Sequence, residues 1–156
     1  MSSSKLFHIA LVVNPLAGLG GPSGRKGSDS LDTAERAKEL GVKSAIPGRL
    51  SLILDGLAEH AERIRFSTAS GPMGADYLDA SGCFQFDCCY QAPKDTSGED
   101  TQRAVDALKQ LEPDLLLFAG GDGTARDVCS VLNSDQVCLG IPSGVKMHSG
   151  VFAVTP

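Results

Sequence analysis

Apolar residues gather in five short runs along the chain, and these runs alternate with stretches of helical periodicity. The runs at Leu6–Val13 and Leu115–Ala119 are rich in branched side chains. Such runs are typical of strands that are buried on both faces of a parallel sheet. Shorter strands are predicted at Arg65–Ala69, Phe84–Tyr90 and Val137–Ile141.

The stretches between the runs carry apolar residues three and four positions apart, which predicts helices. The clearest are Leu50–Ile64 and Ser97–Leu111, and Ser97 with Asp100 resembles an N-terminal cap. Further helices are predicted over Asp29–Leu40, over Pro72–Leu78, and after Thr124 as far as about Leu132. Strands and helices alternate without an internal repeat or a low-complexity linker. This order predicts one α/β domain with an open, mostly parallel, Rossmann-like three-layer sheet.

Glycine-rich segments follow three of the predicted strands, at residues 14–28, 120–124 and 140–150. Because the strands of a parallel sheet end at one edge, these segments should converge there. Glycine lets the backbone approach phosphate oxygens and point N–H groups at them, and the start of a following helix adds a favourable dipole. The sequence therefore predicts a phosphate-binding edge.

The first of these segments matches neither of two common phosphate-binding motifs. In Gly24–Ser28 the Gly-Lys-Ser/Thr of a P-loop is interrupted, and Gly18-Leu19-Gly20 lacks the third glycine of the dinucleotide fingerprint. A surface connection without a ligand is the alternative for this segment. The convergence of three segments is thus a stronger indication than any one of them.

Asp122 lies between glycines directly after a predicted buried strand, where a carboxylate is costly unless it has a task. It could accept the proton of a substrate hydroxyl during phosphoryl transfer, or hold magnesium. Alternatively, it could cap the helix that starts near Thr124, since aspartate is a favoured N-cap residue. The two interpretations are compatible.

Composition narrows the classes of partner. The chain has 156 residues, 42% of them apolar and 18 of them glycine, as in a globular domain with tight loops. Its net charge of -5 provides no basic face for a nucleic acid, so any phosphate must be bound locally. No apolar stretch has the length of a membrane span, and the start does not read as a secretory signal. We therefore expect a cytoplasmic protein without nucleic-acid or membrane partners.

Five cysteines form no C-x-x-C pair and have no nearby histidine, which argues against a zinc site. Their odd number also fits a disulfide framework poorly. The expectation is that they are reduced and serve as small buried apolar residues. They are Cys83, Cys88, Cys89, Cys129 and Cys138.

Phe118–Thr124 resembles the Gly-Gly-Asp-Gly motif shared by NAD kinases, diacylglycerol and sphingosine kinases, and phosphofructokinases. Asn14–Gly21 is similar to the Asn-Pro-x-x-Gly start of the lipid kinases and of an NAD-kinase-like branch. Gly140–Ala153 resembles that branch specifically. The chain thus resembles the N-terminal domain of the ATP-NAD kinase-like family.

This resemblance implies a kinase in which a glycine-rich α/β domain meets a β-rich C-terminal domain across the active site. The chain stops at an apolar segment, Val151–Pro156, and is expected to be the N-terminal part of such a protein, with little activity of its own. The implied reaction is transfer of a phosphoryl group from ATP or polyphosphate to a hydroxyl of NAD or a related acceptor, assisted by magnesium that enters with ATP. The protein itself is expected to hold no metal.

By the same resemblance, Asp122 is the base or orienting group for the ribose 2′-hydroxyl of NAD. The implied nucleotide- and phosphate-binding residues come from all three glycine-rich segments. They are Asn14, Gly18, Gly20, Gly21, Gly120, Gly121, Gly123, Thr124, Ser143, Gly144 and Lys146.

Some charged side chains stay open between binding and ordinary roles. Lys146 could neutralise phosphate charge and His148 could bond a substrate, with plain loop positions as the alternative for both. Arg25, Lys26 and Arg126 are weaker phosphate candidates, since solvated charges are the simpler explanation. His8 and His60 are expected to be structural.

The chain also departs from the better-known NAD kinases. Their Asn-x-Gly-x-x-Gly-Phe-Leu segment is replaced by Pro142–His148, the helix after Thr124 continues differently through Ala125–Val128, and their Asn-Glu pair has no counterpart. The reaction class is therefore better determined than the acceptor. A non-catalytic nucleotide sensor and a lipid kinase are the alternatives. Small-molecule nucleotides are the expected partners, and the oligomeric state, including a homo-oligomer, stays open.

Overall fold

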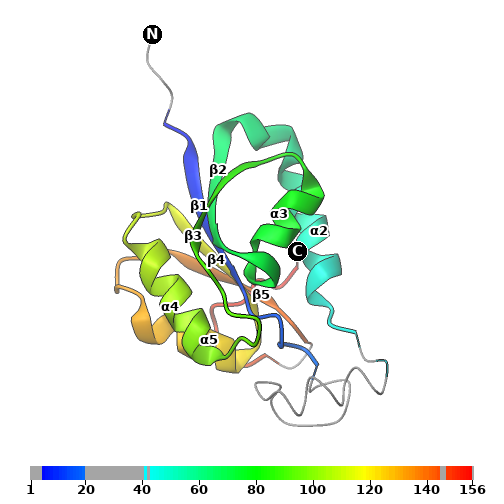
Figure 1. The fold of residues 1–156 in the computed structure, drawn as a ribbon, viewed down its shortest axis with the longest axis vertical. Coiled ribbons are helices and arrows are strands. Elements are labelled where there is room, and N and C mark those ends of the chain that lie inside the picture. Colours follow the sequence, from blue (N-terminus) through cyan, green and yellow to red (C-terminus); the bar gives the residue numbers. More distant parts are fainter. Residues whose placement is uncertain (1–4, 20–40, 42, 145–146, 156) are drawn as a thin grey trace.

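Five strands form one parallel sheet in the computed structural model, which describes residues 5–19, 41, 43–144 and 147–155 (Figure 1). Their order in space is β3-β2-β1-β4-β5, and every neighbouring pair is parallel. The strands are β1 (Phe7–Val13), β2 (Ile64–Ala69), β3 (Gln85–Tyr90), β4 (Leu115–Gly120) and β5 (Cys138–Pro142). The predicted open parallel α/β sheet is confirmed.

Helices cover both faces of this sheet and complete three layers (Figure 1). One face carries α2 (Ile46–Leu57) and α3 (Ala75–Ser81), which contact each other, and the other carries α4 (Gly98–Lys109) and α5 (Asp122–Val131), also in contact. Short 3-10 helices η1 (Ala58–Arg63) and η2 (Gly71–Met73) precede β2 and α3. In the described part of the chain, no helix has the length and apolar composition that crossing a bilayer requires.

The central strand β1 supplies side chains to both halves of the core. Leu11 and Val13 pack in the cluster that contains the apolar residues of α2 and α3, whereas Val12 packs in the cluster under α4 and α5. All three side chains are completely buried. Because successive side chains of a strand point to opposite faces, a strand between two helical layers must be apolar throughout, which explains the run read from the sequence.

The order of the strands reverses between β1 and β4. From β1 the chain builds β2 and β3 on one side, and it then crosses to β4 and β5 on the other. Val13 pairs with Ala119, and Gly120 pairs with Pro142, so β1, β4 and β5 end nearly level. Ligands of open α/β sheets bind in the crevice at such a switch point. The fold therefore places the candidate site beyond these three ends.

Most of the described elements lie where the sequence predicts them, with shifts at their ends. The helix predicted over Leu50–Ile64 begins at Ile46, with Pro47 in its first turn, and it tightens to a 3-10 helix at Ala58. Proline is favoured at a helix start because its missing N–H has no partner there in any case. The predicted cap of α4 is confirmed by a bond of 2.8 Å from the Ser97 N–H to Asp100 Oδ2. The helix predicted over Asp29–Leu40 lies outside the described residues.

The expectation of buried cysteines is wrong. Cys83, Cys88, Cys89 and Cys129 are exposed, and Cys138 is partly exposed, while all five are free thiols. Two of them lie in β3, which is an edge strand and exposes most of its side chains. An edge strand lacks a neighbour on one side, so a strand-like sequence there does not guarantee burial.

Candidate functional site

Three loops meet at the carboxyl edge of the sheet, and they carry most of the residues predicted to bind phosphate. Asn14 follows β1, Gly120–Thr124 joins β4 to α5, and Ser143 with Gly144 follows β5. Gly18 also reaches this edge, because a Cβ on it would lie 2.8 Å from the carbonyl oxygen of Ser143. Three predicted residues lie outside the described part of the chain: Gly20, Gly21 and Lys146.

Asn14 joins the end of β1 to the first turn of α5. Its Nδ2 donates a hydrogen bond of 2.9 Å to Thr124 Oγ1, and its Oδ1 accepts one of 3.0 Å from the N–H of Leu16. Its own N–H bonds the Ala119 carbonyl oxygen at 2.9 Å. Both side chains of the Asn14–Thr124 pair are buried. The pair therefore holds the first loop against the start of α5, and its phosphate-binding role stays a prediction.

Two of the predicted glycines are required by packing between the loops. A Cβ on Gly120 would lie 2.3 Å from Thr124 Oγ1, far inside contact distance, and the Gly120 carbonyl accepts a 2.8 Å bond from the N–H of Ser143. Gly18 has a φ of +82°, which a residue with a side chain adopts only with strain. The sequence interpretation assigned both to phosphate approach. In the structure they let three loops pack closely.

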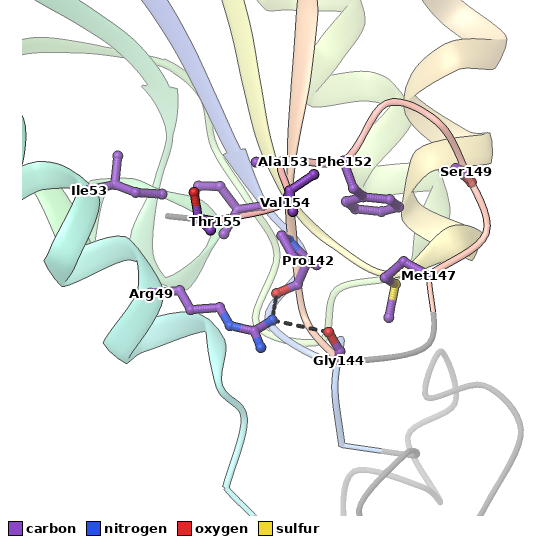
Figure 2. A pocket seen from close by; sticks show the side chains of 11 residues that line it. Arg49, Ile53, Pro142, Gly144, Met147, Ser149, Phe152, Ala153, Val154 and Thr155 are labelled. Carbon is purple, nitrogen blue, oxygen red and sulfur yellow. Dashed lines mark hydrogen bonds between the residues drawn. The ribbon is translucent and has the colours of Figure 1, made fainter.

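Arg49, which the sequence analysis missed, holds the loop after β5 from the side of α2 (Figure 2). This residue of α2 donates hydrogen bonds from one guanidinium nitrogen to the carbonyls of Pro142 and Gly144, the latter at 3.2 Å. A cavity of about 500 Å³ opens beside it, lined by Ile53 and Phe152 among others. An arginine in a predicted helix is common, so nothing in the sequence around Arg49 predicts this contact.

Asp122 is the first residue of α5, and its carboxylate points at the third loop. The N–H of His148 reaches both carboxylate oxygens, at 3.1 and 3.0 Å, while Ser149 donates to Oδ1 from its N–H at 2.9 Å and its hydroxyl at 2.7 Å. The Ser149 hydroxyl bond, followed by these two N–H bonds, lowers the pKa of Asp122 below its ordinary value. The carboxylate is therefore ionised at neutral pH.

The alternative that Asp122 caps α5 is wrong in its geometry. The N-cap residue is Gly121, and no side chain caps this helix end. Asp122 is one position later in the helix, and its carboxylate accepts hydrogen bonds from residues of another loop. Its charge still lies in the first turn, where the helix dipole favours a carboxylate.

A second cavity, of about 600 Å³, opens beside this carboxylate and is lined by Asp122, Arg126 and His148 among others. The described residues include no cluster of three or more side chains suited to hold a metal. One carboxylate suits a magnesium ion that arrives on the phosphates of a nucleotide, since Mg²⁺ is commonly bound by one or two carboxylates plus substrate phosphates. The site can thus orient a hydroxyl or contact a magnesium–nucleotide complex.

The two histidines that were expected to be structural, His8 and His60, lie away from this edge. His8 is buried within β1, with Nε2 2.8 Å from Ser67 Oγ and Nδ1 3.2 Å from an Arg65 nitrogen. Burial and the Arg65 charge lower the pKa of His8, as expected for a structural neutral histidine. His60 lies in the exposed helix η1. Arg25 and Lys26 lie outside the described residues.

Comparison with known proteins adds one finding to this geometry. The sequence model of a family described as the ATP-NAD kinase N-terminal domain matches residues 9–156, which is nearly the whole chain. The comparisons with curated proteins and with solved structures gave no match.

Proposed function

The chain belongs to the ATP-NAD kinase family, in its N-terminal domain, and from this premise we propose that the intact protein transfers a phosphoryl group from ATP or polyphosphate to a hydroxyl of NAD or a related acceptor. The observation that carries the proposal is the ionised Asp122 carboxylate at the start of α5, beside the switch point of the sheet. Family membership supports kinase chemistry in general. The named acceptor rests on the resemblance of the glycine-rich segments.

In this proposal Asp122 orients the acceptor hydroxyl and takes up its proton as the new O–P bond forms and the bond from the transferred phosphorus to the ADP or shortened polyphosphate breaks. A carboxylate with a lowered pKa is a weak base. That is sufficient for phosphoryl transfer, because its transition state is loose in most analyses and catalysis depends mainly on positioning and charge stabilisation. The role of Asp122 is therefore chiefly orientation.

The phosphates of the donor would lie along the three glycine-rich loops. The first turn of α5, at Gly121–Thr124, supplies N–H groups and the positive end of a helix dipole. Ser143 and Gly144 face it from the neighbouring strand end, where Ser143 Oγ is 3.4 Å from the place a Cβ on Gly121 would take. Magnesium bound to the donor would neutralise the charge that develops on the phosphoryl oxygens.

We also propose that a second domain completes this site. The matched family model describes an N-terminal domain, and the resemblance of the motifs implies a β-rich partner domain across the active site. The carboxyl edge described above would then be one wall of the crevice, and the partner domain would supply acceptor contacts.

The experiment is an acceptor panel with the intact protein, MgATP or polyphosphate, and NAD, a diacylglycerol, sphingosine and simple sugars. Asp122→Asn keeps the size of the side chain but removes its charge, and Asp135→Asn, at an exposed loop position, is the matched control. We expect transfer to NAD or a close analogue that D122N strongly reduces and D135N leaves intact. Absence of Asp122-dependent transfer to every acceptor contradicts the proposal, and transfer to a lipid alone redirects it to a lipid kinase.

One observation favours a second candidate, a nucleotide-binding protein without turnover. The Asp122 carboxylate is already engaged by His148 and Ser149, as a purely structural carboxylate would be. Calorimetry distinguishes the two functions. Binding of ATP by an intact protein that transfers phosphate to none of the acceptors would support the binding function.

A further inference from the structure

Ser149, in the loop after β5, makes the shortest hydrogen bond to the Asp122 carboxylate. We infer that Ser149 is a positioning residue for phosphoryl transfer, which turns the Asp122 carboxylate so that its Oδ2 faces the acceptor hydroxyl. This inference rests on the proposed function, since it assigns Ser149 a role through Asp122.

The bonds to the two carboxylate oxygens are unequal. Oδ1 accepts from the Ser149 hydroxyl at 2.7 Å, from the Ser149 N–H at 2.9 Å and from the His148 N–H at 3.1 Å. Among the described residues, Oδ2 accepts only from the His148 N–H, at 3.0 Å. A carboxylate oxygen has two lone-pair sites. Saturation of Oδ1 therefore leaves Oδ2 as the oxygen able to accept a substrate proton.

The loop that carries Ser149 is anchored to the sheet just beyond it. The N–H of Gly140 bonds the Val151 carbonyl at 2.9 Å, and the N–H of Ala153 bonds the Gly140 carbonyl at 2.8 Å. Between these bonds the Phe152 ring packs edge-on against Phe118 of β4, with ring centres 5.6 Å apart.

Gly140 makes this close approach possible. A Cβ at that position would lie 2.6 Å from the Phe152 ring. The path of residues 151–153 is thus set by β5. This anchoring restricts the position of Ser149, which lies two residues before the anchored segment. Such support is what holds a catalytic group in a productive geometry before substrate arrives.

The cavity beside Asp122 offers a place for the acceptor hydroxyl. Ser149 lines both cavities of the edge, while Asp122, Arg126 and His148 line only the second. Figure 2 shows Ser149 on the loop that runs from Met147 to Phe152. The serine therefore borders both cavities, and its hydroxyl donates directly to the Asp122 carboxylate.

The test compares Ser149→Ala, Ser149→Cys and Ser149→Thr in the intact protein, with Ser130→Ala, an exposed serine at the far end of α5, as the control. Loss of a charge-assisted hydrogen bond that orients the acceptor should lower kcat roughly tenfold and leave KM for ATP unchanged. S149C, which keeps the volume but donates weakly, should lose as much as S149A. S149T should recover most of the rate, and S130A should equal the wild type.

A double-mutant cycle with Asp122→Asn separates positioning from general support of the fold. If Ser149 acts through Asp122, adding S149A to D122N lowers the residual rate no further. Carboxyl-detected NMR titration of the protein supplies a readout without catalysis, in which S149A should raise the pKa of Asp122 and S130A should not.

The outcomes keep the two claims apart. An active wild type that D122N leaves unaffected overturns the proposed function. Loss of activity in D122N together with full activity in S149A and S149C overturns the inference alone. Two further results would show that Ser149 is no positioning residue. In one, S149A lowers the rate of D122N by the same factor as it lowers the rate of the wild type; in the other, S149A leaves the pKa of Asp122 unchanged.

Discussion

Asn14 and Thr124 are 110 positions apart in sequence, yet the amide of the first donates a 2.9 Å hydrogen bond to the hydroxyl of the second. The bond crosses the point where the strand order reverses, between the ends of β1 and β4. Both residues belong to motifs that resemble kinase phosphate loops. Their contact means that the two motifs are parts of one buried assembly at the carboxyl edge of the sheet.

Replacing Asn14 by alanine should lower the free energy of unfolding by about 1–3 kcal/mol, because it leaves the Thr124 hydroxyl and the Leu16 N–H without this partner. Urea unfolding at neutral pH measures the change. Asn133→Ala, at an exposed loop position, should stay within about 0.5 kcal/mol of the wild type. An equally small loss for N14A would contradict a structural role for the pair.

Gly120→Ala should destabilise the protein by about 1–3 kcal/mol, since the added methyl group overlaps the buried Thr124 side chain. It should also weaken ATP binding, because relief of the overlap moves the start of α5. The control is Gly56→Ala at an exposed position of α2, where a Cβ meets no neighbour within 4 Å; it should gain up to about 1 kcal/mol from better helix propensity. Thermal unfolding and calorimetry with ATP test both effects, and an unperturbed G120A would refute the packing argument.

The positions of strands and of the candidate edge follow from the sequence because they depend on local patterns. A buried parallel strand needs an unbroken apolar run, as at Leu115–Ala119, and a loop that follows it must lie at the carboxyl edge. The cap formed by Ser97 and Asp100 is similarly local, since both partners lie within four residues. Such features require no knowledge of distant segments.

Contacts between distant segments could not be predicted in this way. Asp122 bonds Ser149, 27 positions later, and Arg49 bonds carbonyls more than 90 positions away. Neither partner carries a sequence signal, because a backbone carbonyl or a loop serine is chemically ordinary. The exposure of Cys88 and Cys89 has the same origin, since a strand's place at the edge of the sheet depends on the strand order.

Asp100 should make stability depend on pH in the acid range. Burial alone would raise its pKa, but hydrogen bonds from the Tyr90 hydroxyl and from Ser97 outweigh this and lower it. A carboxyl group whose pKa is lower in the folded state stabilises the protein above its unfolded pKa, and this contribution is lost as pH falls through the folded pKa. Asp100→Asn should therefore cost about 1–2 kcal/mol at pH 7.

The cost of D100N should shrink as pH falls below the ordinary pKa of an aspartate, about 3.9, because the unfolded chain then takes up a proton that the folded carboxylate resists. Urea unfolding from pH 7 to pH 3 measures both proteins, with Asp135→Asn as an exposed control. A D100N cost that is the same at every pH would assign the effect to shape and not to charge.

Arg49→Met should loosen the loop after β5 while keeping the aliphatic contacts of the side chain. Its guanidinium bonds two carbonyls of the segment that carries Ser143. Without it, that loop keeps the Ser143 N–H bond to Gly120, the bonds from His148 and Ser149 to Asp122, and the pairing of residues 151–153 with Gly140. We expect a loss of about 1–2 kcal/mol in stability and ATP binding weakened by roughly tenfold. The weaker binding follows from a loop that must be ordered again when the nucleotide binds, so the cost should appear in the entropy of binding.

Calorimetry with ATP measures the change in affinity for R49M, and Arg63→Met, at an exposed position of η1, is the matched control. Unchanged ATP affinity in R49M would mean that the loop keeps its shape without the arginine, and that its other hydrogen bonds are enough to order it.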